Sequence, residues 1–294
     1  MPLSPKTTSE EDALLWGARA LKEIANTRAR HEARLLLGGV LKKDPTTLGF
    51  DGGAMLTTSA WEAYQEVVAR RLRHEPISRI LGYREFWSLS FEISPDTLDP
   101  RPDSEILIET VLSFLKNHPQ RPWGTSAAPC LLDFGTGSGC LLVALLTELP
   151  QFWGVGIDKS INALEMAQRN AARHELSKRA FFVASNWADA LLGSVDLLIS
   201  NPPYIPACDV ETLDLDVRDY DPRSALTPGV TGLEAYEILA RQSVSLLKAE
   251  GICALEIGAG QEEDVRALFE KAGLHFISQH KDLQSHVRCL LFQR

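Results

Sequence analysis

The stretch Leu131-Leu132-Asp133-Phe134-Gly135-Thr136-Gly137-Ser138-Gly139 decides the fold of this 294-residue chain. Its apolar first half predicts a short buried β-strand, and its glycines predict a tight turn that opens a helix. A strand, a glycine turn and a helix in this order are typical of an α/β sheet that binds a cofactor at the turn. The spacing is G-x-G-x-G and not the dinucleotide-binding G-x-G-x-x-G, which disfavours a nicotinamide dehydrogenase.

From residue 130 onward, strand and helix patterns alternate along the chain. This alternation predicts an α/β domain with a mainly parallel, doubly wound, Rossmann-like sheet. Strands are expected at 130–133, 153–158, 180–184, 195–200 and 251–256, helices at 140–148, 161–174, 233–248 and 262–272, and a closing hairpin at 275–279 and 287–292.

The N-terminal part of the chain has a different period. Helical patterns cover 13–24, 28–41 and 60–73, whereas residues 87–93 alternate between apolar and polar and predict a strand paired with 80–84. The predicted organisation is therefore a helical domain over 1–76, a hairpin and linker over 77–104, and the α/β domain over 105–294.

A second informative stretch, Ile199-Ser200-Asn201-Pro202-Pro203-Tyr204-Ile205, follows the predicted strand at 195–200. Pro202 and Pro203 remove two consecutive N–H donors, so the Asn201 carboxamide oxygen and the Pro202 carbonyl are available as acceptors, with Tyr204 as an aromatic wall. Such acceptors suit a planar –NH2 group on a carboxamide or a base. The alternative interpretation is a turn that only ends a strand.

Polar residues also follow the other predicted strands. Asp158 ends the second strand, where a carboxylate can accept both ribose hydroxyls, although it could instead cap the next helix, a role that Ser160 could fill. Asn186 could bond an adenine edge, and Trp187 could pack on its face or belong to the core. Strand ends of one sheet meet at one crevice. The candidate cofactor-binding residues are Gly135, Thr136, Gly137, Ser138, Gly139, Asp158, Asn186, Trp187 and Asn201.

Composition narrows the class of protein. A net charge of −9 argues against a broad phosphate-binding surface. The five cysteines are scattered without metal-ligand spacing, and the seven histidines form no ligand pattern, so we expect free thiols, a reducing cytoplasm and no metal. No apolar run approaches a membrane span, and Met1 to Asp12 lacks a signal-peptide core.

The glycine turn, the acidic residue after the second strand and Asn-Pro-Pro-Tyr after the fourth together resemble S-adenosylmethionine-dependent methyltransferases of amino groups. Over about residues 30–288 the chain resembles one family, the bacterial release-factor glutamine methyltransferases of the HemK/PrmC type. The motifs that carry this resemblance are Arg73-His74-Glu75-Pro76-Ile77, Gly82-Tyr83-Arg84-Glu85-Phe86-Trp87, Pro100-Arg101-Pro102-Asp103-Ser104-Glu105, Tyr220-Asp221-Pro222-Arg223, Gly232-Leu233 and Glu256-Ile257-Gly258.

The resemblance implies a class I methyltransferase domain that uses S-adenosyl-L-methionine to methylate the glutamine of the Gly-Gly-Gln motif in peptide chain release factors. It further implies that Asn201, Pro202, Pro203 and Tyr204 form the catalytic turn, with Asn201 and the Pro202 carbonyl holding the substrate amide. The helical domain would dock the protein substrate, and the enzyme would be a monomer without a nucleic-acid partner. The chain departs from the family pattern at Asp99, Asn186 and Thr231.

Rival functions remain open at this point. A glutamine methyltransferase of a ribosomal protein would share these motifs, an adenine-N6 methyltransferase would share Asn-Pro-Pro-Tyr, and a non-catalytic adaptor could bind the same cofactor. An acidic loop could steer a basic protein substrate, or it could be only a solvated loop. Its carboxylates are Asp209, Glu211, Asp214, Asp216, Asp219 and Asp221.

Overall fold

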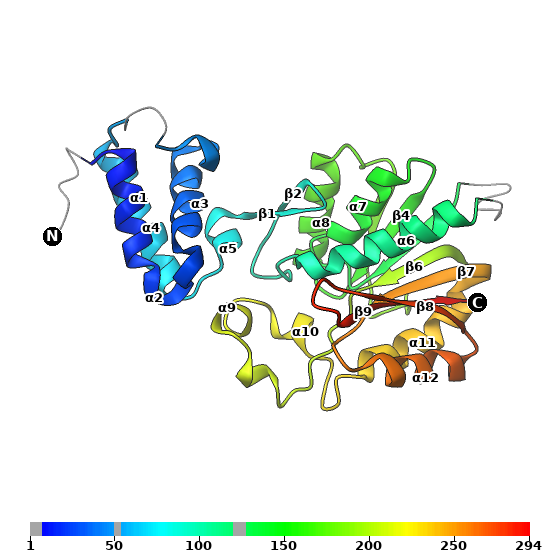
Figure 1. Cartoon of the computed structure of the whole chain (residues 1–294). Coiled ribbons are helices and arrows are strands. Elements are labelled where there is room, and N and C mark those ends of the chain that lie inside the picture. Colours follow the sequence, from blue (N-terminus) through cyan, green and yellow to red (C-terminus); the bar gives the residue numbers. More distant parts are fainter. Residues whose placement is uncertain (1–7, 50–53, 120–127) are drawn as a thin grey trace. The chain divides into compact units, whose positions relative to one another are not determined.

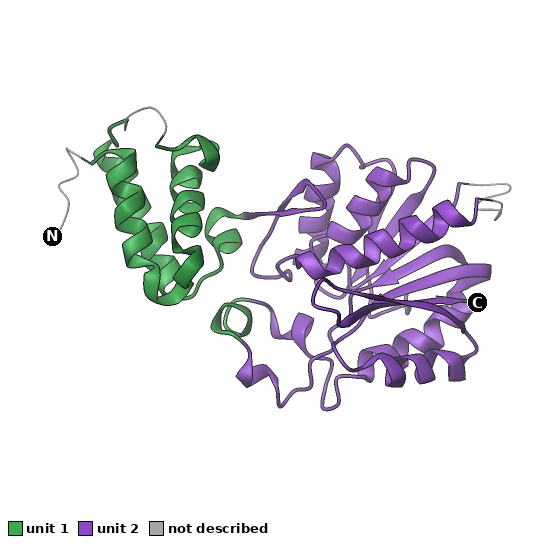
Figure 2. Ribbon diagram, viewed as in Figure 1, with its two compact units in different colours: residues 1–82, 214–220 green, residues 83–213, 221–294 purple. Residues whose placement is uncertain are grey.

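The computed structural model describes residues 8–49, 54–119 and 128–294 of the chain. The chain forms two compact units, coloured separately in Figure 2. The first comprises residues 1–82 and 214–220, and the second comprises residues 83–213 and 221–294. No helix in these described ranges is both long enough and apolar enough to cross a membrane.

The first unit is helical, and its core combines alanine and leucine side chains with a few aromatic rings. Trp61 and Tyr64 are buried, the ring of Trp16 lies 5.0 Å from that of Trp61, and the Tyr64 hydroxyl donates to the Ala33 carbonyl at 3.1 Å. Ser9 begins the first helix and forms a capping box with Asp12. The α-helices of this unit are α1 (Glu10–Ala20), α2 (Lys22–Ala25), α3 (Ala29–Leu41), α4 (Thr58–Leu72), α5 (Ile77–Leu81) and the short α9 (Leu215–Arg218).

The second unit is built on a seven-stranded sheet with the strand order β5-β4-β3-β6-β7-β9-β8. Figure 1 shows this sheet with helices packed against it. The first five strands in this order are parallel, and β9 and β8 are antiparallel to their neighbours. The strands are β3 (Cys130–Phe134), β4 (Trp153–Asp158), β5 (Ala180–Ala184), β6 (Val195–Ser200), β7 (Leu247–Glu256), β8 (His275–Lys281) and β9 (Val287–Gln293).

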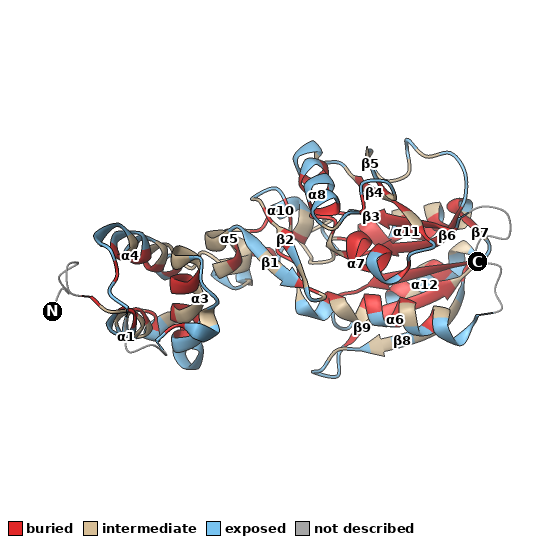
Figure 3. Cartoon of the chain, turned by 90° about the horizontal axis from the view of Figure 1, so that it is seen from above, coloured by how far each residue is buried: buried red, intermediate tan, exposed pale blue. Residues whose placement is uncertain are grey.

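Helices cover both faces of this sheet. Helices α6 (Glu105–Asn117), α7 (Cys140–Glu148) and α8 (Ile161–Arg173) pack into one buried cluster, and α11 (Glu234–Leu246) and α12 (Glu262–Ala272) pack into the other. Strands β3 and β6 are buried along their whole length, as Figure 3 shows, which explains their unbroken apolar sequences. The prediction of a doubly wound α/β domain joined to a helical N-terminal domain is confirmed.

Two local predictions were wrong. Residues 80–84 do not form one strand, because Pro76 precedes a helical turn, α5, which Gly82 ends with a left-handed φ of 80°. The hairpin follows as β1 (Tyr83–Phe86) and β2 (Leu89–Glu92). The acidic loop is also not a bare loop, because it contains α9, and α10 (Arg223–Leu226) follows it.

Candidate active site

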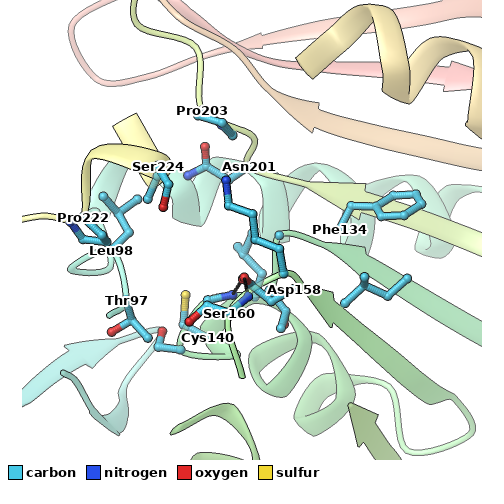
Figure 4. A pocket seen from close by; sticks show the side chains of 18 of the residues that line it. Thr97, Leu98, Phe134, Cys140, Asp158, Ser160, Asn201, Pro203, Pro222 and Ser224 are labelled. Atoms are coloured by element: carbon cyan, nitrogen blue, oxygen red, sulfur yellow. Dashed lines mark hydrogen bonds between the residues drawn. The ribbon is translucent and has the colours of Figure 1, made fainter. Parts of the chain in front are cut away.

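A pocket lies at the carboxyl ends of β3, β4, β5 and β6 (Figure 4). The chain order reverses there between β3 and β6, and α/β sheets bind ligands at such switch points. Segments distant in sequence meet in one lining. The predicted residues that line it are Gly135, Thr136, Gly137, Ser138, Asp158, Asn186, Trp187, Asn201 and Pro203.

The glycine turn lines the pocket with backbone atoms, because Gly135 and Gly137 have no side chains. Gly139 does not line the pocket; it begins α7 with φ 79°, and a Cβ atom there would lie 3.0 Å from the Ala167 side chain of α8. This glycine therefore allows α7 and α8 to pack closely. Asn170, a buried residue that the sequence did not single out, donates to the Ser138 carbonyl at 2.9 Å and to the Glu92 carbonyl at 2.9 Å, and so fixes the turn against β2.

Asp158 joins the end of β4 to the glycine turn. One carboxylate oxygen accepts from the Gly137 N–H at 3.0 Å, and the other accepts from the Ser160 N–H at 2.9 Å. Ser160 itself caps α8 by accepting from the Ala163 N–H at 3.2 Å. Asp158 is therefore not needed as the helix cap, and its half-buried carboxylate borders the pocket.

Asn186 and Trp187 close the side of the pocket that follows β5. Asn186 is exposed, and its Nδ2 lies 3.4 Å from Oδ2 of Asp189, which leaves its amide oxygen available. The half-buried Trp187 ring packs edge-on against Phe134, with ring centroids 6.2 Å apart, and it also lines the pocket. Trp187 therefore packs against the core and also lines the pocket, so both locations predicted for it apply.

If Asn186 accepts from the adenine amino group, Asn186→Leu is expected to weaken cofactor binding by about 1–3 kcal/mol, because that donor loses its partner. Asn186→Asp keeps an acceptor and should bind nearly as well as the parent, apart from repulsion by Asp189. Calorimetric titration with S-adenosylmethionine measures both variants. Equal affinities for the leucine variant and the parent would show that Asn186 makes no such contact.

The Asn-Pro-Pro-Tyr turn begins directly after β6. Asn201 lines the pocket, and its Nδ2 donates to Oγ of Ser104 at 3.1 Å. The Pro202 carbonyl accepts no hydrogen bond from the residues that the structure describes, so both predicted acceptors of the turn remain available. Figure 4 shows Asn201 above the pocket, between Pro203 and Ser160.

Pro202 and Tyr204 lie outside the lining of this pocket. Pro202 is buried, and the Tyr204 ring borders a neighbouring depression, where a Cβ atom on Gly258 would lie 3.0 Å from it. Gln261 holds this part of the turn by donating to the Tyr204 carbonyl at 3.0 Å while it accepts from the Gly258 N–H at 3.0 Å. Burial raises the pKa of the Tyr204 hydroxyl to about 12.

Two further segments of the pocket wall, within residues 96–101 and 222–225, were not predicted from the sequence. Asp221 joins the two segments: it pairs with the Arg101 guanidinium and accepts from the Asp99 N–H at 3.2 Å. Asp221 is only 7% exposed, so the prediction that it belongs to the acidic loop that could steer a substrate was wrong. Two other carboxylates of that loop are paired, Asp219 with Arg218 and Glu211 with Arg223.

Asp133 is a second buried residue that the sequence did not single out. It is 1% exposed, and its Oδ2 accepts from the Thr136 hydroxyl at 2.7 Å, beneath the glycine turn. Burial raises its pKa to about 7. Its only signal in the sequence was a carboxylate within an otherwise apolar strand.

Because the pKa of Asp133 is raised in the folded state, the unfolded chain ionises this carboxyl more readily than the folded chain does. The free energy of unfolding is therefore highest below the ordinary pKa of 3.8 and falls as the pH rises through about 7. We therefore expect the stability of Asp133→Asn relative to the parent to increase between pH 5 and pH 8 by about 3 kcal/mol, because about two pH units of this window lie below the raised pKa. Urea unfolding of the variant and the parent at pH 5 and at pH 8 measures the free energies of unfolding. The same difference between variant and parent at both pH values would contradict the prediction. Taking the difference from the parent removes the contribution of other groups.

Within the described part of the chain, no group of three or more histidine, cysteine or acidic side chains could hold a metal ion. All five cysteines are free thiols, and three of them are buried.

The sheet order, the glycine turn and the pocket at the switch point define the class I methyltransferase-like fold. The catalytic domain of hMettl16, solved in complex with the MAT2A 3'UTR hairpin 6, has this fold. It superposes with a TM-score of 0.55 at 15% identity, covering 70% of this chain and 76% of that one. A likeness at that identity concerns the fold alone.

Comparison with related sequences identifies the family within this fold class. Residues 12–82 match the PrmC N-terminal domain model, and residues 109–213 match the methyltransferase small domain model. The release factor glutamine methyltransferase of Rhodospirillum rubrum is 42% identical over 97% of this chain and 87% of its own length. That of Bradyrhizobium diazoefficiens is 40% identical over 87% of this chain and 85% of its own. The chain belongs to the release factor glutamine methyltransferase family.

Proposed function

We propose that this protein transfers a methyl group from S-adenosyl-L-methionine to the side-chain amide nitrogen of the glutamine in the Gly-Gly-Gln motif of peptide chain release factors. The position of Asn201 carries the proposal. It lies at the end of β6 and lines the same pocket as the glycine turn and Asp158. Family membership over nearly the whole chain supports the choice of substrate.

The pocket fits the cofactor. The turn over residues 135–139 allows close approach of a ligand, and the Asp158 carboxylate can accept the ribose hydroxyls. The Asn186 amide oxygen can accept from the adenine amino group, beside the Trp187 ring. When bound, S-adenosylmethionine supplies an electrophilic methyl group on a sulfonium.

The protein's task is placement, because an amide nitrogen is a poor nucleophile. Asn201 Oδ1 and the Pro202 carbonyl would accept the two N–H bonds of the substrate amide and present the face of its nitrogen to the methyl group. Near-attack positioning can supply up to about 7–11 kcal/mol of a barrier in well-oriented cases. In methyl transfer the nitrogen would gain a bond to carbon as the sulfonium gives up its methyl group, the two acceptors would stabilise the positive charge that develops on the nitrogen, and the nitrogen would then lose a proton to solvent.

We also propose that the helical unit docks the release factor, and that the enzyme acts in the cytoplasm as a monomer without a nucleic-acid partner. The match of residues 12–82 to the PrmC N-terminal domain model supports a separate role for this unit, for which we propose docking. The net charge of −9 disfavours a nucleic-acid substrate, and the free thiols suit a reducing compartment.

The experiment is incubation of the purified protein with labelled S-adenosylmethionine and, separately, release factors, ribosomal proteins, duplex DNA and RNA. Mass spectrometry of the products should find one methyl group on the Gly-Gly-Gln glutamine. A release factor with alanine in place of that glutamine is the matched control and should remain unlabelled. Labelling of only a ribosomal protein or of adenine would overturn the proposal.

A further inference from the structure

Glu256 is a buried carboxylate that the proposed reaction does not use. It ends β7, next to the turn after β6, because Leu255 pairs with Ser200 and the following residues are Glu256 and Asn201. Glu256 is 2% exposed, and its Oε2 has no hydrogen-bond partner among the residues that the structure describes. A buried carboxylate without full pairing is costly to maintain, so its presence beside Asn201 requires an explanation.

Ser104 links this carboxylate to Asn201. It is 3% exposed and begins α6, but its side chain makes no capping hydrogen bond. Its hydroxyl instead accepts from Nδ2 of Asn201 at 3.1 Å. Burial raises the pKa of Glu256 to about 7, and the Ser104 hydroxyl is the strongest of the influences that lower it, ahead of Arg288 and the Asn201 amide.

The chemistry of these groups sets the direction of the hydrogen bonds. Ser104 is among the groups that favour the ionised form of Glu256. Because an ionised carboxylate only accepts, we infer that the Ser104 hydroxyl directs its hydrogen toward Glu256, which leaves the Ser104 oxygen to accept from Asn201. The Asn201 amide then has to turn its nitrogen toward Ser104. A neutral partner at position 256 could donate as well as accept, which would permit the opposite orientation of the amide.

We propose that Glu256, acting through Ser104, is a positioning residue that holds the Asn201 carboxamide with its nitrogen toward the protein and its oxygen toward the pocket. This inference rests on the proposed function only in so far as that oxygen is the group that accepts the substrate amide. A flipped carboxamide would present N–H groups to the N–H groups of the substrate, and two donors cannot pair.

The charge on Glu256 is set by groups on several neighbouring elements. Arg288 on β9 favours the ionised form, whereas Asp103, before α6, disfavours it. Other titratable groups that interact with this carboxylate are Tyr204, Tyr236, Cys140 and Cys289. All four have raised pKa values and are neutral near pH 7, so the local balance depends on Arg288 and Asp103.

A double-mutant cycle on release-factor methylation tests the inference. We expect Glu256→Gln and Ser104→Ala each to lower kcat about tenfold without changing the dissociation constant of S-adenosylmethionine. The double variant should be no slower than either single variant, because both act through one chain of hydrogen bonds. Ser104→Thr keeps the hydroxyl and is the matched control, which should recover most of the rate. Parent-like kcat in Glu256→Gln, or additive losses, would overturn the inference.

A second readout needs no substrate. The side-chain NH2 resonances of Asn201, assigned by their loss in Asn201→Asp, should shift with pH around 7 in the parent and remain constant in Glu256→Gln. If these resonances do not respond to pH in the parent, Glu256 does not orient Asn201. If the parent fails to methylate release factors but the resonances titrate as expected, the proposed function fails and the positioning role stands.

Discussion

Replacing Asn201 with alanine is expected to lower the turnover of release-factor methylation by about 10²–10³, with little change in cofactor affinity. Removal of one preorganised polar group that faces developing charge typically has an effect of this size. Nδ2 of Asn201 is held by Ser104, so the oxygen is the part of the side chain that is free to act on a substrate. The measurements are kcat on a release factor and calorimetric binding of S-adenosylmethionine.

The cofactor titration separates two roles for Asn201, which lines the pocket together with the candidate cofactor contacts. A loss of cofactor affinity as large as the loss of turnover would mean that Asn201 is chiefly a cofactor ligand. Asn186 provides a matched control, because it is an asparagine in the lining of the same pocket. Asn186→Ala should change cofactor affinity while leaving kcat at saturating cofactor almost unchanged.

The sequence predicts the α/β unit well because its strands are buried and its turns are chemically constrained. β3 and β6 are apolar throughout, and helices α7 and α12 begin and end at the expected residues. A parallel sheet brings its carboxyl ends to one edge, so the ends of β3 to β6 could be assigned to one pocket without knowledge of any distance.

What the sequence could not provide are contacts between segments far apart in the chain. Asp221 reads as one acid among many in a polar loop, yet its pairing with Arg101, 120 residues away, buries it in the pocket wall. Ser104 stands out in the sequence only as part of a family motif, yet its hydroxyl accepts from Nδ2 of Asn201, 97 residues on. Glu256 belongs to a family motif, but the motif does not indicate that its carboxylate is buried beside Asn201, because this depends on how β6 and β7 pair.

The sheet edge also explains why one carboxylate should dominate cofactor affinity. Asp158 accepts two backbone N–H groups, Gly137 on the glycine turn and Ser160 on the next loop, so it aligns both sides of the pocket mouth. We expect Asp158→Ala to weaken S-adenosylmethionine binding about 10- to 150-fold, since a hydrogen bond to a charged group contributes about 1.5–3 kcal/mol. Thermal unfolding should show that the fold persists.

Two effects would contribute to that loss, the missing ribose contact and a looser glycine turn, and an analogue of the cofactor without ribose hydroxyls separates them. If Asp158 binds the hydroxyls, the analogue should bind the parent and Asp158→Ala with nearly equal affinity, while S-adenosylmethionine discriminates strongly between them. If both ligands lose affinity equally, Asp158 acts only through the backbone of Gly137 and Ser160. Unchanged binding of S-adenosylmethionine in the alanine variant would remove Asp158 from the site altogether.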